Sequence, residues 1–191
     1  NNPNSLSNNS VWFVFVDKDG LVWVGTDNGL NSYSKKTDKF TCYRPDHDNP
    51  NSLSDNHVRA IAGDKEGNLW IGTKNTGIDK FDKKTKTFTN YKHNPNNLNS
   101  LSYNEIHHIM IDRFNNLWIC NEGGKTGIDC YNEKTNTFKH YSYDSKDPNS
   151  ISSNNILYSF EDSTGIIWLT DDEGNIDKCT WKKDIFKNYS Y

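Results

Sequence analysis

The chain has 191 residues with 32% hydrophobic residues and a mean hydropathy of −0.94, and no stretch approaches the roughly 18 continuous apolar residues of a membrane span. Aromatic residues nevertheless make up 13% of the chain, and this much ring area indicates a folded protein with a thin, aromatic core. The 22 basic and 25 acidic residues are scattered and give a formal net charge of −3, so neither nucleic acid nor a membrane surface is an expected partner.

One unit of about 48 residues occurs four times along the chain. Each copy opens with Asn-Ser-Leu-Ser or Asn-Ser-Ile-Ser, at residues 4–7, 51–54, 99–102 and 149–152. A tryptophan lies 17 residues after the Leu or Ile in every copy, at Trp23, Trp70, Trp118 and Trp168. Each copy closes with Phe-x-x-Tyr, at residues 40–43, 88–91, 138–141 and 186–189. This constant spacing indicates one repeated supersecondary structure.

Within each unit, apolar and aromatic runs bounded by turn residues predict four short strands. In the first unit these runs are 11–16, 21–26, 30–34 and 39–43. The first turn carries Asp-x-x-Gly in three units, where Asp caps the turn and Gly supplies a positive φ. The third unit has Asn115 at the glycine position, and Asn is the residue that best tolerates the left-handed region after Gly.

Four-stranded antiparallel units repeated at this spacing predict an all-β fold, a β-propeller with four blades, because each small sheet has two apolar faces and must stack between neighbours. We expect one propeller segment over residues 1–191, with blades at approximately 6–43, 53–91, 101–141 and 151–189. The fixed spacing disfavours an immunoglobulin-like sandwich. Since the sequence starts without an initiator Met, we also expect a segment of a larger protein.

The loop between the second and third strands is the part of the unit that changes length, at residues 27–29, 74–77, 121–127 and 171–174. Strand alternation places these loops and the long connections between blades at the same end of the propeller, and variable loops on a constant scaffold usually form binding surfaces. The first strand lies nearest the axis, so its opening residues, Leu157 among them, should crowd the channel mouth at that end. The candidate ligand-binding residues are Trp12, Arg59, His107, Asn28, Lys74, Asn75, Glu122, Lys125 and Asp172.

The combination of Leu-Ser-x-Asn, Asp-x-x-Gly, Leu-Trp-Ile-Gly-Thr, Gly-Ile-Asp and Phe-x-x-Tyr closely resembles the two-component regulator propeller repeat, best in residues 53–91. The resemblance covers essentially the whole chain. It implies the sensor domain of a hybrid two-component or histidine kinase regulator, located outside the cytoplasm (periplasmic or extracellular) in a membrane-anchored parent protein. Gly-Thr at the end of the second strand becomes Cys120-Asn121 and Thr170-Asp171 in the last two units.

No sequence pattern marks a catalytic nucleophile, a metal site or a cofactor, and none is expected. His107 and His108 beside Glu105, and the acidic run 171–173, are the local clusters that could suggest metal or acid/base chemistry. Adjacent strand residues point to opposite faces, so we expect solvated or packing roles for both clusters. Four cysteines without a C-x-x-C pair indicate neither a zinc site nor a disulfide framework, and whether Cys120 and Cys130 form a bridge is left open.

The leading functional hypothesis is a ligand-sensing propeller that recognises an oligosaccharide or another small polar ligand on the face with the variable loops. A polysaccharide-active lyase or hydrolase is the alternative and would need His107 to meet Glu122 or Asp172; a protein-interaction scaffold is a third.

Four blades leave two apolar sheet faces uncovered, so the blades could close as a tight ring, two chains could form an eight-bladed ring, or a longer parent could supply missing blades. We expect a twofold homodimer in isolation.

Overall fold

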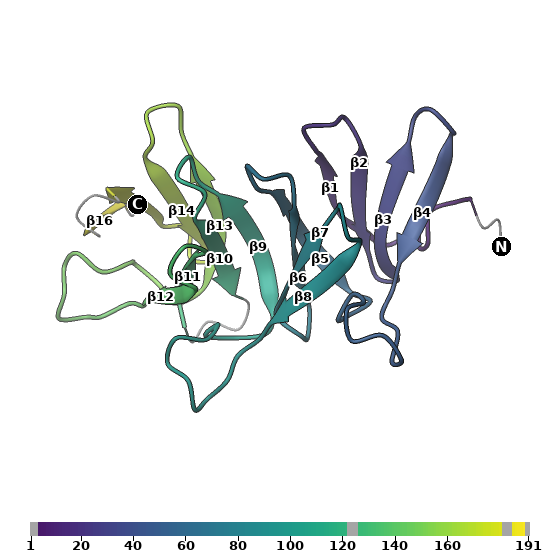
Figure 1. Ribbon diagram of the computed structural model, residues 1–191. Helices are drawn as coiled ribbons and strands as arrows, with labels where there is room; N and C mark the ends of the chain where they lie inside the picture. Colours follow the sequence, from purple (N-terminus) through teal and green to yellow (C-terminus); the bar gives the residue numbers. More distant parts are fainter. Residues whose placement is uncertain (1–3, 122–125, 181–184, 190–191) are drawn as a thin grey trace.

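The computed structural model of the protein describes residues 4–121, 126–180 and 185–189, and it is built from four four-stranded antiparallel sheets. In the described residues no helix is present, and so none could span a membrane. The sheets stand side by side in chain order, with the N-terminal sheet at one end and the C-terminal sheet at the other (Figure 1). This arrangement confirms the predicted propeller segment with four blades.

The first sheet comprises β1 (Val11–Val16), β2 (Val22–Thr26), β3 (Gly29–Ser34) and β4 (Lys39–Tyr43). The second comprises β5 (Val58–Gly63), β6 (Leu69–Thr73), β7 (Ile78–Asp82) and β8 (Thr87–Tyr91). The third comprises β9 (Ile106–Ile111), β10 (Leu117–Asn121), β11 (Ile128–Asn132) and β12 (Thr137–Tyr141). The fourth comprises β13 (Ile156–Glu161), β14 (Ile167–Asp171), β15 (Ile176–Thr180) and β16 (Ile185–Tyr189). Every sheet keeps its strands in chain order, as short hairpin connections require.

The predicted turns after the first strands are present. The carboxylate of Asp17 accepts hydrogen bonds from the backbone N–H groups of Asp19 and Leu21, at 3.0 and 2.9 Å. These bonds close the turn before β2. Gly20 follows with a φ of +76°, and the third sheet has Asn115 at the equivalent place with a φ of +68°. The substitution of Gly by Asn therefore preserves a left-handed residue at this corner.

Adjacent sheets pack through two faces that differ. We call the face toward the next sheet in the chain the trailing face and the face toward the previous sheet the leading face. At the first junction, Trp23 and Tyr43 on the trailing face meet Phe81 and Phe88 on the leading face, with the rings of Trp23 and Phe81 centred 5.7 Å apart. Trp70 and Tyr131 repeat this contact at the second junction, 5.4 Å apart. Trp23, Trp70 and Trp118 of the tryptophan series are thus core residues, whereas Trp168 in the last sheet is half-buried.

The Asn-Ser-Leu-Ser connections are fastened to the next blade by a repeated hydrogen-bonded latch. The backbone N–H and hydroxyl of Ser54 donate to the fully buried carboxylate of Asp79 at 2.9 and 2.8 Å. Ser102 with Asp129, and Ser152 with Asp177, make the same pair of bonds. The Asp of Gly-Ile-Asp is therefore a structural residue, because buried carboxylates need several donors.

No disulfide joins the cysteines in the part of the chain that the structure describes, and Cys120 and Cys130 are not bridged there. Complete burial raises the pKa of Cys120 to about 12. A thiol held protonated in this way is an inert packing group.

Candidate ligand-binding site

A β-bulge opens the innermost strand of every sheet at the same position. In β1, Val11 pairs with Thr26 and Phe13 pairs with Gly25, so Trp12 between them has no cross-strand partner. The residues at the same bulge position of β5, β9 and β13 are Arg59, His107 and Leu157. A bulge re-aims a side chain without disturbing the rest of the ladder. The residues expected at the channel mouth are thus the four bulged residues.

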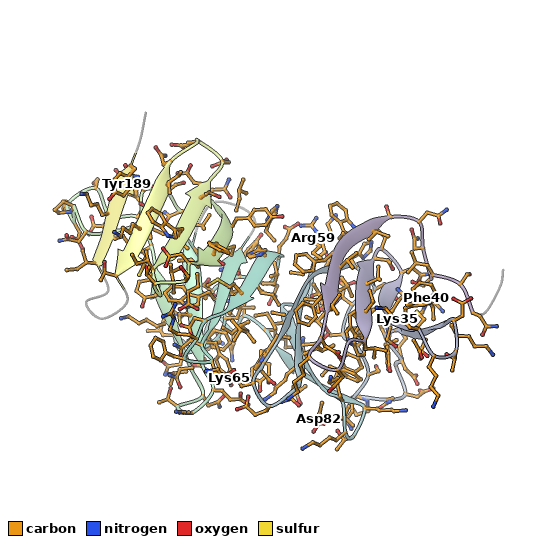
Figure 2. The ribbon with its side chains drawn as sticks, turned by 90° about the horizontal axis from the view of Figure 1, so that it is seen from above. Lys35, Phe40, Arg59, Lys65, Asp82 and Tyr189 are labelled. Atoms are coloured by element: carbon orange, nitrogen blue, oxygen red, sulfur yellow. The ribbon has the colours of Figure 1, made fainter. Side chains whose placement is uncertain are left out.

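Three of the bulged side chains meet in one cavity of about 300 Å³, whose lining is Trp12, Phe13, Arg59, His107 and Tyr158. The cavity lies at the end of the propeller that carries the variable loops, because Val11 pairs with Thr26 immediately before the first loop. Arg59 lies between the two end sheets in Figure 2. A cavity of this size is at the lower end of the range for small-molecule sites. Trp12, Arg59 and His107 are brought together as the sequence predicts.

Trp12 and Arg59 form the half of the cavity with a fixed geometry. The indole N–H of Trp12 donates to Oδ1 of Asp27 at 2.6 Å, and this bond holds the pKa of Asp27 below its usual range. The Arg59 guanidinium lies 5.3 Å from the centre of the Trp12 ring, and its Nη1 contacts Glu105 at 3.4 Å. A planar aromatic face beside a guanidinium suits a ligand with an apolar face and oxygen acceptors.

The two adjacent histidines have different roles, as strand alternation predicts. Nδ1 of His107 donates to the carbonyl of Leu157 at 3.0 Å, so in the neutral ring Nε2 carries the lone pair. His108 is buried on the trailing face of its sheet, with its ring centre 4.5 Å from that of Tyr158 and 6.3 Å from that of Phe13. Burial lowers the pKa of His108 to about 4. His108 is therefore a neutral packing group that supports the cavity lining.

The amide residues of the variable loops fasten the connections between blades. Nδ2 of Asn28 donates to the carbonyl of Ser7 at 3.2 Å. The backbone and side-chain amides of Asn75 both donate to Asp55, at 2.9 and 2.8 Å, and the backbone N–H of Lys74 donates to the carbonyl of His57. None of the three lines the cavity around Trp12. Their predicted contact with a ligand stays a prediction, and their hydrogen bonds have a structural role.

Asp172 also lies apart from the cavity lining. It is exposed, and its carboxylate accepts a hydrogen bond from Asn155 at 2.5 Å rather than from His107. Glu122 and Lys125, the other predicted loop residues, lie outside the described residues. An enzyme would need His107 to pair with an acidic residue. Among the residues that the structure describes, Asp172 does not form that pair.

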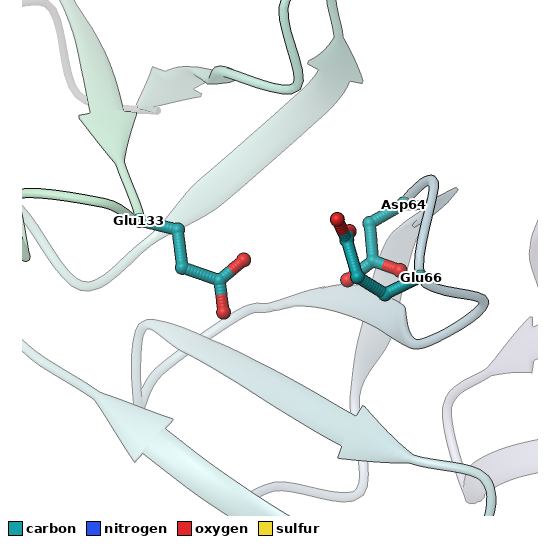
Figure 3. A group of neighbouring side chains, drawn as sticks. All are labelled: Asp64, Glu66 and Glu133. Atoms are coloured by element: carbon teal, nitrogen blue, oxygen red, sulfur yellow. The ribbon is translucent and has the colours of Figure 1, made fainter.

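At the opposite end of the blades, carboxylate oxygens of Asp64, Glu66 and Glu133 lie within 4.8 Å of one another (Figure 3). Nζ of Lys80 forms an ion pair with Glu133 and lies 3.8 Å from Asp64. Asp64 also accepts two hydrogen bonds from Asn68, at 2.7 and 2.9 Å. The ammonium group of Lys80 thus offsets part of the negative charge of Asp64 and Glu133.

A model of a known protein family matches part of the chain. The family model for the two-component regulator propeller matches residues 5–28 and 52–75, which are the openings of the first two units. These two segments of the chain are similar to that repeat. No curated protein matches the chain in sequence.

Solved structures that resemble this propeller include two extracellular domains from B. thetaiotaomicron. One is assigned to the hybrid two-component system BT3049 and the other to the one-component system BT4673, with 25% identity over 97% of this chain and TM-scores of 0.82 and 0.81. The propeller segment spans 25% of the length of each. Virginiamycin B lyase from Staphylococcus aureus also has this fold, with a TM-score of 0.73, 16% identity and coverage of 98% of this chain and 58% of the lyase.

Sequence reasoning missed Tyr158 in the cavity and placed Leu157 there instead. Leu157 is the bulged residue of β13, but its carbonyl binds His107, and the ring of Tyr158 lines the cavity. Tyr158 in the fourth sheet is the equivalent of Phe13 in the first sheet, and each lies one residue after the bulge. Once the bulge is known, the aromatic residues at these two equivalent positions indicate that both rings line the cavity.

Proposed function

We propose that this propeller segment is the ligand-sensing part of a regulator, located outside the cytoplasm, and that it binds an oligosaccharide or another small polar ligand. The observation that supports this proposal best is the convergence of the bulged residues Trp12, Arg59 and His107 on one cavity at the variable-loop end. The structurally similar extracellular domains of the BT3049 and BT4673 systems support the location and the regulatory role.

The cavity chemistry favours a ligand that combines an apolar face with several oxygen atoms. The Trp12 ring is 53% exposed and offers a stacking surface, while Arg59 offers donors and the Nε2 atom of neutral His107 an acceptor. Pyranose rings have this combination, with C–H groups on one face and hydroxyl groups at the edge. Binding then requires stacking on Trp12 and hydrogen bonds to Arg59 and His107.

The test is a thermal unfolding screen of the whole chain against oligosaccharides of plant and bacterial origin, with a peptide panel beside it. A ligand at one hundred times its dissociation constant should stabilise the fold by about 2.7 kcal/mol. Trp12→Ala should abolish the shift. Phe114→Ala, which removes a 46% exposed ring from the opposite end of the third sheet, is the matched control and should keep it.

Two results would contradict this proposal. A flat response to both panels would remove the sensing function, and a glycan shift that survives Trp12→Ala would place the binding site elsewhere.

A further inference from the structure

A second cavity lies at the turn end of the second and third blades, at the opposite end of the blades from the variable loops. Its volume is about 500 Å³, and its lining comes from the turns that follow β5, β9 and β11. The lining includes Glu66 of the second blade and Phe114, Asn115, Glu133 and Lys134 of the third. A cavity of this volume lies within the range of small-molecule sites. Its walls belong to two blades that each have a neighbour on both sides (Figure 1).

The first junction between blades has an ammonium group at the equivalent place. Nζ of Lys83, just after β7, lies 2.8 Å from Asp17 and 2.7 Å from Asp19. Both aspartates belong to the first turn of the preceding blade. One lysine of the second blade therefore binds two carboxylates of the first blade.

The second junction keeps the two acidic residues but has a third one in place of the lysine. Asp64 and Glu66 stand at the places of the two aspartates, and Glu133 stands at the place of Lys83. Carboxylate oxygens of all three lie within 4.8 Å of one another, and the Glu133 side chain points across the junction toward the other two (Figure 3). Because like charges at this separation repel, a cation between them is stabilising.

Lys80 offsets part of this charge, but it does not pair with Glu66. Nζ of Lys80 forms an ion pair with Glu133 and lies 3.8 Å from Asp64. Among the described residues, the Glu66 carboxylate has one hydrogen-bond donor, the side-chain amide of Asn115 at 3.0 Å. Glu66 is exposed, so a cation from solution can reach it. The space beside Glu66 thus lacks the ammonium group that the first junction contains.

The other lysines at these turns make different contacts. Nζ of Lys65 donates to the carbonyl oxygen of Arg113, and Nζ of Lys18 donates to the carbonyl oxygen of Lys65 at 3.2 Å. Lys134 lines the cavity but is exposed, and within the part of the chain that the structure describes it forms no ion pair with either glutamate. None of these ammonium groups takes the place that Lys83 has in the first junction.

An exposed aromatic ring lines the same cavity. Phe114 stands at the place of Asp19, Glu66 and Thr164, so the other three blades have a polar residue at this turn position. The Phe114 side chain is 46% exposed. The face of an aromatic ring attracts a cation, and its apolar surface packs against an alkyl chain. Carboxylates beside a ring fit an ammonium group on an aliphatic chain better than they fit a metal ion.

We propose that the cavity between the second and third blades binds an aliphatic amine, with its ammonium group between Glu66 and Glu133 and its carbon chain against Phe114. Because the carboxylate oxygens lie within 4.8 Å of one another, one nitrogen can be within hydrogen-bond distance of both glutamates. These charge-assisted hydrogen bonds repeat the contacts of Lys83 in the first junction. The ligand replaces the lysine that the third blade lacks.

Binding is tested by isothermal titration calorimetry of the whole chain with cadaverine at low ionic strength. Pentanediol with hydroxyl groups at both ends has the same carbon chain without the charges and is the control ligand. The expected result is saturable binding of one cadaverine molecule per chain and no binding of the diol. Equal heats from the two ligands, or cadaverine heats that never saturate, would overturn the proposal.

The position of the ammonium group is tested with substitutions that keep side-chain size. Glu66→Gln and Glu133→Gln should each weaken cadaverine binding by about tenfold or more, because each removes a charged acceptor. Phe114→Leu should weaken it by about two- to fivefold, since it removes the ring and keeps an apolar side chain. Glu173→Gln, at an exposed acidic residue of the opposite end, is the matched control and should bind as the unmodified chain does. An equal loss in Glu173→Gln would reveal non-specific attraction and refute the site.

Glu133→Lys tests the comparison with the first junction directly. This substitution supplies an internal ammonium group, so it should abolish cadaverine binding while circular dichroism shows that the strands remain folded. Undiminished binding by the folded variant would be incompatible with the proposal. Trp12→Ala, at the other end of the blades, should bind cadaverine as the unmodified chain does, so this site can be present or absent whether or not the cavity near Trp12 binds a ligand.

Discussion

The first turn of the first, third and fourth blades carries an aspartate with two tasks. Asp112 accepts the backbone N–H groups of Phe114 and Asn116, both at 2.9 Å, and its second oxygen accepts the indole N–H of Trp118 at 3.0 Å. Asp17 with Trp23 and Asp162 with Trp168 form the same indole bond. Because a buried indole N–H needs a partner, the carboxylate explains how a tryptophan occupies this core position.

We expect Asp112→Ala to lower the free energy of unfolding by about 2–4 kcal/mol, since it leaves the Trp118 N–H buried without an acceptor and removes the turn cap. Urea unfolding followed by fluorescence measures the change. Glu173→Ala, at an exposed acidic residue, is the control and should change stability by less than about 0.5 kcal/mol. A loss of the same small size for Asp112→Ala would show that the turn does not depend on this carboxylate.

His108 predicts a loss of stability in mild acid. Its folded pKa of about 4 lies below the value of about 6.5 for an unfolded chain, so the unfolded chain binds a proton first as the pH falls. The stabilisation is present above pH 6.5 and is lost between about 6.5 and 4, by at most about 1.4 kcal/mol per pH unit. His108→Gln should flatten this part of the curve of unfolding free energy against pH. Parallel curves for the two proteins over that interval would contradict the prediction.

At the scale of the strand and its connection, the latch of the third blade differs from its neighbours in one residue. His140 occupies the place of Asn90 and Asn188, which donate to the buried aspartates of their own blades. Nδ1 of His140 donates to Asp129 at 2.7 Å and Nε2 donates to the carbonyl of Leu98 at 2.9 Å. Both bonds exist together only in the protonated ring, and the bond to Asp129 raises the pKa of His140.

This raised pKa predicts the opposite pH dependence from that of His108. A group whose folded pKa is raised contributes its full stability below about pH 6.5 and loses it as the pH rises through the folded value. His140→Asn restores the residue of the neighbouring blades and keeps a donor to Asp129, so it should remove the alkaline loss alone. Unfolding midpoints in urea measured from pH 6 to pH 9 give the comparison. A wild-type midpoint that stays constant over this range would rule out a charged His140 latch.

The fold was predictable from the sequence because each element is specified four times. The indole of Trp23 and the ring of Tyr43 recur at fixed spacings, and the exchange of glycine for Asn115 occurs where only a left-handed residue fits. The site was predictable in part. The order of the strands predicted that Trp12, Arg59 and His107 lie near one another. A bulge, however, inserts a single residue through backbone geometry that residue types do not signal. Without knowledge of the bulge, the sequence predicted Leu157 in the cavity, where the structure has Tyr158.

At the scale of the whole molecule, each sheet obtains its core from its neighbours. The second and third sheets are covered on both faces and the end sheets on one, so stability should be a sum of sheet and junction terms. Local opening should therefore begin at the two ends.

Hydrogen exchange measured by mass spectrometry at the lowest workable protein concentration should show this gradient. The amides of β6 and β10, whose residues are all buried, should exchange slowest, and those of β16 fastest. Equal protection of all four sheets in dilute solution would contradict the additive description.

The bulge at the start of each inner strand separates recognition from folding. Trp12, Arg59, His107 and Leu157 lie at the bulges, outside the ladder pairs, so each can change without altering a ladder pair. A combinatorial library randomised at these four positions should therefore yield a high proportion of folded proteins. Such a scaffold can acquire new specificities by one substitution per blade, and binders for unrelated small molecules could be selected from it.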